Sequence, residues 1–261
     1  MRIITGCPRS GTSFVCQIAL TLGANFGNES ELISGNQWNQ NGYFENKKIN
    51  EINHRLLFGR WSNPNIWIDK IWEDNFSSYY RKIASMLLAP VVCRESNIAA
   101  RSQKFHDEIQ THADQSIGIT IKDPRFCYVL PAWIPTGQVE SILFVMRHPW
   151  EIANSLSRQT GLPKWLTYRA YNDAIDRFLN FANDIDFTIV NFNAFQGDHA
   201  DQEIKLMTKF LGTGPRNSDR VTKSTYQRRH QSSFFNDRLG VPKSTLSRHQ
   251  KLLDIRNGDN C

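Results

Sequence analysis

The sequence predicts an α/β protein with three layers, in which a central parallel sheet is flanked by helices. Three observations predict it. Short apolar, β-branched runs end in loops that carry Gly, Pro or charged residues. Segments with helical apolar spacing lie between these runs, and the alternation continues to about residue 212. Strands that alternate with helices are typical of a parallel sheet.

Length and composition favour a single domain. The 261 residues, 40% of them hydrophobic, can build one core, and no long linker or internal repeat divides them. We expect residues 1–212 to form the α/β core. Residues 213–261 form a basic segment in which apolar periodicity nearly vanishes, so we expect either a partly disordered surface segment or a lid over a ligand.

Charge and cysteine usage restrict the class of protein. The formal net charge of +6 and the pI near 9.1 suit an anionic ligand, but they suit nucleic acid or an anionic surface equally well. Five widely spaced cysteines without a Cys-x-x-Cys pair argue against a zinc site or a disulfide framework. Residues 14–24 are too short for a membrane span, and no signal peptide is evident. We therefore expect a cytoplasmic protein.

The chain begins with a predicted strand at residues 2–5, a loop, and a helix with an apolar pattern over residues 14–22. Gly6 and Gly11 permit a tight turn between them. The amides of such a loop point toward an anion, and the positive end of the helix dipole lies behind them. A phosphate or sulfate group is therefore expected here.

The loop departs from a Walker A loop at one position. Gly6, Gly11 and Ser13 match that pattern, but Thr12 replaces its lysine, and the basic residue lies within the loop as Arg9. A nucleoside triphosphatase would lose the lysine that binds its β- and γ-phosphates. The remaining guanidinium, hydroxyls and amides suit a 5′-phosphosulfate held without a metal.

The segment Cys7-Pro-Arg-Ser-Gly-Thr-Ser13 resembles the 5′-phosphosulfate loop of sulfotransferases that use 3′-phosphoadenosine 5′-phosphosulfate (PAPS), in the form common among bacterial and Golgi-type members. The resemblance implies a P-loop-like version of the α/β fold. It also implies that the 5′-phosphosulfate is bound by the loop residues Arg9, Ser10, Gly11, Thr12 and Ser13.

A second motif follows a predicted buried strand at residues 142–146, which places Arg147 at the edge of the sheet. The segment from Arg147 to Ser155 resembles the 3′-phosphate element of the same family, in which an arginine and a serine eight residues later share one phosphate. An arginine offers a planar fork to phosphate oxygens, and a serine on the following helix adds a hydroxyl donor. The resemblance implies that Arg147 and Ser155 bind the 3′-phosphate.

Glu45 ends the segment Gly42-Tyr-Phe-Glu45, just before residues with helical apolar spacing. Many bacterial sulfotransferases have a similar element, and a glutamate from this region is the general base in related enzymes that act on sugars. The resemblance implies that Glu45 accepts the proton of the acceptor hydroxyl. The alternative is a carboxylate that complements the dipole at a helix N-terminus.

Alternating Ile117, Ile119 and Ile121 predict a strand that ends at Lys122, before Pro124 turns the chain away. The following Lys-Asp-Pro-Arg resembles a family element whose lysine approaches the sulfuryl group. Lys122 is then expected to stabilise charge on the leaving phosphate. Asp123 is the second candidate for the base, because no histidine lies here, where the cytosolic branch of the family places its catalytic histidine.

Other elements are expected further along the chain. Helices are predicted within residues 79–88, 101–113, 161–179 and 203–211, and a strand over 187–192. Trp61, Trp67 and Trp72 either cover the core or stack on a sugar.

We therefore expect a PAPS-dependent sulfotransferase that needs no metal and releases 3′-phosphoadenosine 5′-phosphate. Its acceptor is expected to be a small molecule or glycan, with carbohydrate or glycolipid hydroxyls favoured and nucleic acid not expected. One alternative is a P-loop nucleotide kinase-like phosphotransferase, which would need a lysine at position 12 and an acidic Mg²⁺ ligand such as Asp123. The other is a non-catalytic protein that binds anions or nucleic acid through its basic segment.

Overall fold

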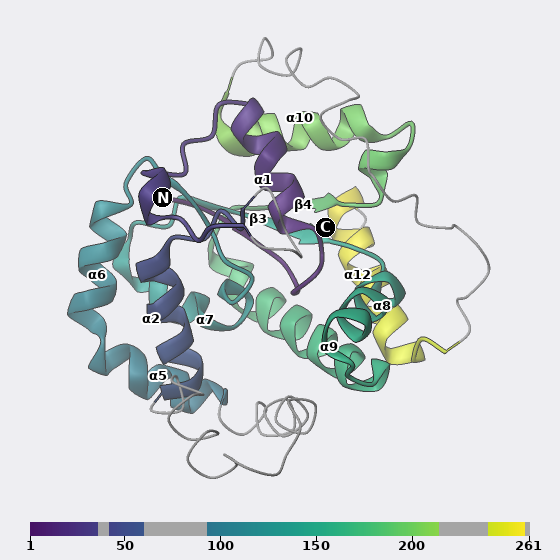
Figure 1. The fold of residues 1–261 in the computed structure, drawn as a ribbon, viewed down its shortest axis with the longest axis horizontal. Helices are drawn as coiled ribbons and strands as arrows, with labels where there is room; N and C mark the ends of the chain where they lie inside the picture. The colour runs from purple at the N-terminus through teal and green to yellow at the C-terminus, as the bar shows by residue number, and fades with distance from the viewer. Residues whose placement is uncertain (36–41, 60–92, 214–239, 259–261) are drawn as a thin grey trace.

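The computed structural model describes residues 1–35, 42–59, 93–213 and 240–258 (Figure 1). Its central sheet has four parallel strands in the order β2-β1-β3-β4. β1 therefore lies between two partners, and its Ile3 pairs with Ile121 on one side and with Ile142 on the other. The strands are β1 (Arg2–Thr5), β2 (Thr120–Lys122), β3 (Ser141–Met146) and β4 (Phe187–Asn191).

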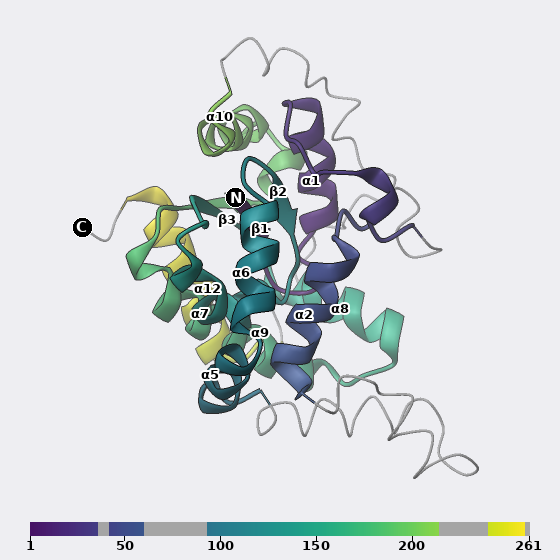
Figure 2. The same ribbon diagram turned by 90° about the vertical axis from the view of Figure 1, so that its left-hand side faces the viewer.

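Helices cover both faces of this sheet, as the two views in Figures 1 and 2 show. On one face, α1 (Thr12–Thr21) and α10 (Ala200–Leu211) pack on Ile4, Leu143 and Val145. Ile3, Ile142 and Phe144 face the other core, which is built mainly from the helices α2 (Lys47–Phe58), α5 (Glu95–Lys104), α6 (His106–Gln115), α7 (Phe126–Trp133), α8 (Pro149–Thr160), α9 (Lys164–Phe181) and α12 (Lys243–Asn257).

Successive residues of a strand point to opposite faces, so one buried sheet supplies both cores. The predicted three-layer α/β fold, with a loop and helix after the first strand, is confirmed. Short 3₁₀ turns complete the described elements at Glu29–Glu31, Ile134–Thr136, Ala182–Asp184 and Ala194–Gln196.

Because all four strands are parallel, their carboxyl ends share one edge of the sheet. Gly6 follows β1, Lys122 ends β2, Arg147 follows β3 and Phe192 follows β4. Residues that are distant in the sequence therefore meet at this edge, where ligands bind in open α/β sheets.

Two predicted elements differ in the structure. The helix expected over residues 101–113 is two helices, α5 and α6, which meet at Phe105. The strand expected from Ile117 is shortened to β2, because Gly118 adopts a φ of +74° and Ile117 is exposed. The helix expected over 79–88 and the three tryptophans lie outside the described residues.

The basic C-terminal segment contains α12, a helix that the apolar pattern did not predict. α12 packs against α8, α9 and β4, although only Thr245 and Leu252 of the helix are buried. Arg256 on α12 pairs with the buried Glu203 of α10, which also accepts a hydrogen bond from the Asn191 amide. The core therefore extends beyond residue 212, where the sequence analysis placed its end.

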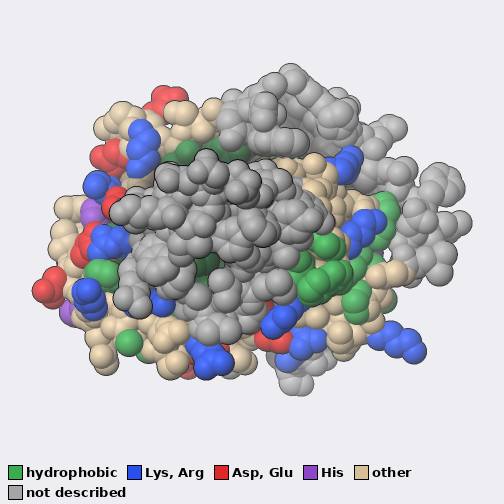
Figure 3. Space-filling view, turned by 60° about the horizontal axis from the view of Figure 1, so that its bottom comes forward, with side chains coloured by type: hydrophobic (Ala, Val, Ile, Leu, Met, Phe, Trp, Pro, Cys, Tyr) green, Lys and Arg blue, Asp and Glu red, His purple; other side chains and the backbone are tan. Residues whose placement is uncertain are grey.

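The described helices and one face of the molecule were inspected for membrane-spanning segments and for charged patches. Among the described residues, no helix combines the length and the apolar character needed to cross a membrane. On the described part of the face in Figure 3, Lys and Arg side chains lie among Asp and Glu side chains.

Replacing Arg256 with Ala should lower the free energy of unfolding by about 3 kcal/mol near neutral pH, because the fully buried Glu203 carboxylate loses its cation. Burial raises the pKa of Glu203, and loss of Arg256 should raise it further. The folded variant then binds more protons than the unfolded chain. Its stability therefore falls as the pH rises from the pKa of Glu203 in the unfolded state toward its higher pKa in the folded state.

Urea unfolding at about pH 5 and about pH 8 should therefore show a smaller loss of stability at the lower pH. The double variant Arg256→Ala with Glu203→Gln is the control, and it should lose this pH dependence. An equal loss at both pH values would contradict the prediction.

Candidate functional site

The loop between β1 and α1 is shaped by two glycines. Gly6 and Gly11 have φ values of +153° and +97°, and the non-glycine Arg9 adopts +72°. A Cβ atom on Gly6 would lie 2.5 Å from the Val145 carbonyl oxygen, and one on Gly11 would lie 2.2 Å from the Phe192 ring. The loop is thus packed directly against β3 and the residue that follows β4, which leaves no room for a side chain at either glycine.

The loop and the first turn of α1 present hydrogen-bonding groups for an anion. α1 begins after Gly11 without a side-chain cap, so the first amides of the helix are not satisfied by a capping side chain. The Oγ atom of Ser10 is buried and has no hydrogen-bond partner among the described residues. A buried hydroxyl without a partner, beside helix N-terminal amides, suits a ligand rich in oxygen atoms.

Two arginines join this loop to the β3–α8 segment. Nε of Arg9 donates to Oγ of Ser155 at 3.0 Å, and Nη1 of Arg147 donates to the Arg9 carbonyl oxygen at 3.0 Å. Burial lowers the pKa of both arginines, and Arg147 lowers that of Arg9 further. Arg147 has Glu151 as an ion-pair partner at 2.7 Å, whereas Arg9 pairs with no carboxylate in the described part of the chain. The Arg9 charge is therefore available to an anionic ligand.

Lys122 and Glu45 form a buried ion pair beside the loop. Nζ of Lys122 lies 2.6 Å from Oε1 of Glu45 and 3.3 Å from Oγ of Ser13. The Lys122 side chain is only 2% exposed and that of Glu45 10%. The two residues that the sequence analysis expected to be catalytic therefore contact each other, and the lysine also contacts the predicted phosphosulfate loop.

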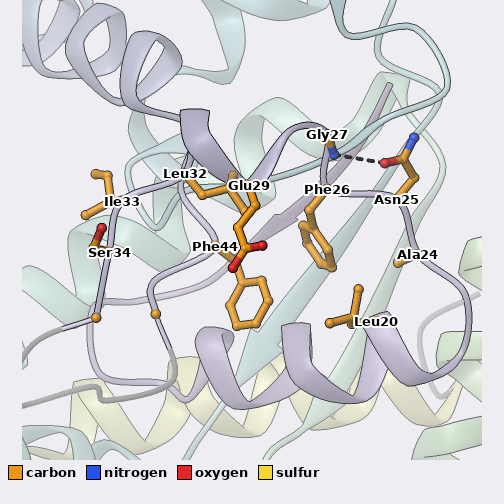
Figure 4. Close-up of a pocket in the computed structure, with 12 residues that line it drawn as sticks. Leu20, Ala24, Asn25, Phe26, Gly27, Glu29, Leu32, Ile33, Ser34 and Phe44 are labelled. Carbon is orange, nitrogen blue, oxygen red and sulfur yellow. Dashed lines mark hydrogen bonds between the residues drawn. The ribbon is translucent and has the colours of Figure 1, made fainter.

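An unusual backbone conformation places Glu45. Phe44 has a φ of +57°, a value that bulky side chains rarely adopt. Tyr43 and Glu45 line the same cavity as Lys122, whereas Phe44 lines a second cavity of about 570 Å³ (Figure 4). There the Phe44 ring packs on Phe26, with the ring centres 5.2 Å apart. This packing helps to hold the strained backbone that turns Glu45 toward Lys122.

Asp123, the second candidate for the base, does not line the cavity. Its side chain is 1% exposed, Oδ2 accepts from Nδ2 of Asn53 at 3.0 Å, and Oδ1 accepts from the amide and Nε of Arg125 at 2.8 and 2.9 Å. Asn53 in turn accepts a hydrogen bond from Nε1 of Trp133 at 2.8 Å. These contacts hold Asp123 in the core, and of the two candidate carboxylates Glu45 is the one that lines the cavity.

The cavity beside the loop has a volume of about 320 Å³. Seven of the predicted site residues line it, namely Arg9, Gly11, Thr12, Ser13, Glu45, Lys122 and Arg147. Ser155 does not line the cavity but accepts a hydrogen bond from Arg9, which does, and Ser10 lies buried in the loop. The structure thus brings all nine predicted residues together around one cavity or the loop beside it.

Several residues near the cavity were not predicted from the sequence as site residues. Phe14, Tyr43 and Phe192 line its walls, and Arg125 contacts Glu45. Arg125 lies within the Lys-Asp-Pro-Arg motif, and Phe192 ends the predicted last strand, so both were close to recognised signals. Among the described residues, no three His, Cys, Asp or Glu side chains gather in a way that could hold a metal ion.

The chain was compared with known families, curated proteins and solved structures. No protein-family model and no curated protein matches the chain. Its structure is similar to that of a solved sulfotransferase domain from the curacin biosynthetic pathway, with a TM-score of 0.42, 13% sequence identity and 97% of each chain covered.

Replacing Gly11 with Ala should disturb the loop, because the added Cβ would collide with the Phe192 ring and the φ of +97° disfavours a side chain. Gly137→Ala is a matched control, since Gly137 also has a positive φ, of +71°, but a Cβ there meets nothing within 4 Å. Urea unfolding should show a loss of about 1 kcal/mol for Gly137→Ala and an additional loss of about 1–3 kcal/mol for Gly11→Ala. Equal losses in the two variants would contradict the close packing of the loop.

Proposed function

We propose that this protein is a sulfotransferase that uses PAPS as donor and transfers the sulfuryl group to a hydroxyl of a carbohydrate or glycolipid. One observation carries the proposal. The hydrogen bonds from Arg147 to Arg9 and from Arg9 to Ser155 join the two elements that are predicted to bind anions, and the Lys122–Glu45 pair lines the same cavity. Two anion sites beside a cation and a carboxylate suit a donor with two phosphate positions and a transferable group.

The residues present fit such a donor. The 5′-phosphosulfate would be held by the buried hydroxyl of Ser10, the amides of the first turn of α1 and the charge of Arg9, which pairs with no carboxylate among the described residues. Arg147 and Ser155 would hold the 3′-phosphate, one from the end of β3 and the other from α8. These groups are cations, hydroxyls and amides, which are the usual partners of phosphate and sulfate oxygens.

The remaining side chains supply the chemistry. When bound, the donor would supply a sulfuryl group attached to a phosphate leaving group. Lys122, whose Nζ lies 3.3 Å from Ser13 in the loop, would stabilise the negative charge that develops on this phosphate. Glu45 would take the proton of the acceptor hydroxyl as that oxygen attacks sulfur in line. Tyr43, whose ring lines the cavity near Lys122, offers an aromatic face to a sugar acceptor.

Calorimetric titration with 3′-phosphoadenosine 5′-phosphate should show binding that needs no metal. Arg147→Ala should weaken this binding by about 10-fold or more, because charge-assisted hydrogen bonds to the 3′-phosphate are lost. Arg248→Ala serves as the control, since Arg248 pairs with Asp176 rather than lining the cavity. 5′-AMP, ATP with Mg²⁺, and DNA should bind less well.

Tighter binding of ATP with Mg²⁺ would instead favour a kinase. Salt-sensitive binding of arbitrary DNA, without a preference for the bisphosphate, would favour a nucleic-acid-binding protein.

Glu45→Gln should lower the rate of sulfuryl transfer by about 10²–10⁴-fold, because the amide cannot accept the acceptor proton. The variant should still bind 3′-phosphoadenosine 5′-phosphate. Glu51→Gln is the matched control, because Glu51 lies on the exposed side of the neighbouring helix α2. Transfer from PAPS to a panel of sugar and glycolipid acceptors measures the effect, and an undiminished rate in Glu45→Gln would remove this residue from the mechanism.

A further inference from the structure

We propose that Arg125 is a positioning residue that anchors Oε2 of Glu45, so that Oε1 is the oxygen that takes the proton of the acceptor. This inference rests on the proposed function and deepens it. It assigns separate tasks to the two oxygens of one carboxylate and gives a role to Arg125, which does not line the cavity.

Arg125 connects three parts of the structure. Its Nη2 donates to Oε2 of Glu45 at 3.2 Å, its Nε donates to Oδ1 of Asp123 at 2.9 Å, and its Nη1 donates to the carbonyl oxygen of Asn50 in α2 at 3.3 Å. A guanidinium group has five N–H donors in a rigid plane, so one side chain can hold all three acceptors. Arg125 thus links the end of β2 to the segment that carries Glu45.

Arg125 is held in place by Asp123 and by the buried residues that Asp123 contacts. Oδ1 of Asp123 accepts from both the amide and Nε of Arg125, and Oδ2 accepts from Asn53. Asn53 in turn accepts a hydrogen bond from Nε1 of the fully buried Trp133. This chain of buried contacts anchors Arg125 to the core, which gives Asp123 a structural task consistent with its position outside the cavity.

The two oxygens of Glu45 have different partners. Oε2 accepts from Nδ2 of Asn50 at 2.6 Å as well as from Arg125, and neither donor lines the cavity. Oε1 accepts from Nζ of Lys122, which does line the cavity. The oxygen that faces the reaction space is therefore Oε1.

Lys122 is shared between Glu45 and the loop. Its Nζ lies 2.6 Å from Oε1 of Glu45 and 3.3 Å from Oγ of Ser13, so an anion in the loop would compete with Glu45 for the ammonium group. When Lys122 turns toward that anion, Oε1 loses its donor, while Arg125 and Asn50 still hold Oε2. The carboxylate then stays in place and cannot follow the lysine toward the anion.

The proposed transfer step moves one proton to Glu45 and one sulfuryl group to the acceptor. The O–H bond of the acceptor breaks as its proton passes to Oε1 of Glu45, and the acceptor oxygen forms a bond to sulfur. The bond between sulfur and the bridging oxygen breaks, and its electron pair remains on the phosphate oxygen, where Lys122 stabilises the charge. The enzyme returns to its starting state when Glu45 releases the proton to water.

Kinetics on Arg125→Ala and Arg125→Lys test the assignment. We expect kcat of Arg125→Ala to fall about 10–100-fold, because a misplaced base lowers the rate of the chemical step. The affinity for 3′-phosphoadenosine 5′-phosphate, measured by calorimetry, should change less than about twofold, because the hydrogen bonds of Arg125 in the described structure go to Glu45, Asp123 and Asn50. Millimolar guanidinium should restore part of kcat in Arg125→Ala but none in Glu45→Gln, and Arg125→Lys should be intermediate.

Arg55→Gln is the control, because Arg55, an arginine on α2, pairs with Glu108 rather than with a residue of the cavity. Undiminished kcat in Arg125→Ala, an equal loss in Arg55→Gln, or loss of nucleotide affinity in step with kcat would each overturn the inference. If the wild-type protein neither binds the bisphosphate nor transfers sulfate, the proposed function fails and the inference fails with it. If the wild type is active and Arg125→Ala is equally active, the inference alone fails.

Discussion

The parallel pairing of β1 between β2 and β3 is the constraint on which the site depends. It places the glycine loop, Lys122 and Arg147 at one edge of the sheet, although they belong to distant parts of the chain. Gly6 and Gly11 then allow the loop to lie against Val145 and Phe192 without a gap. A larger residue at either glycine would push the loop away from the strand ends, so backbone packing and ligand binding are parts of the same arrangement.

The charges at this edge of the sheet are better suited to binding a ligand than to stabilising the fold. Arg9 and Arg147 lie together and are partly buried, and burial disfavours the charged form of each guanidinium group. Charges of alternating sign follow one another along Lys122, Glu45, Arg125 and Asp123. Their attraction offsets the free-energy cost of removing each group from water, but such buried pairs seldom stabilise a protein more than apolar packing would. An anionic ligand would complete the pairing on the Arg9 side.

The elements that could be predicted from the sequence are those with strong local signals. The strands at 2–5 and 142–146 are continuous apolar runs, and the glycine loop and Arg147 follow them directly. α7 was not predicted, because six of its eight residues are buried, so it has no polar face to reveal a helical period, and Pro131 lies within it. α12 was missed for the opposite reason, since few of its residues are buried. The contacts of Arg125 and Asp123 depend on α2 and β2 coming together, which no local pattern encodes.

The shared position of Lys122 has a consequence for the order of events. A single ammonium group cannot fully satisfy both Oε1 of Glu45 and an anion beside Ser13, so occupation of the loop and release of Glu45 are coupled. Such coupling is reciprocal: whatever draws Lys122 toward the loop frees the carboxylate, and whatever neutralises the carboxylate frees Lys122 for the loop. Without an anion beside Ser13, the ion pair with Lys122 occupies Oε1 of Glu45. Under the proposed function, Glu45 would therefore activate the acceptor only when the sulfuryl donor is already in place.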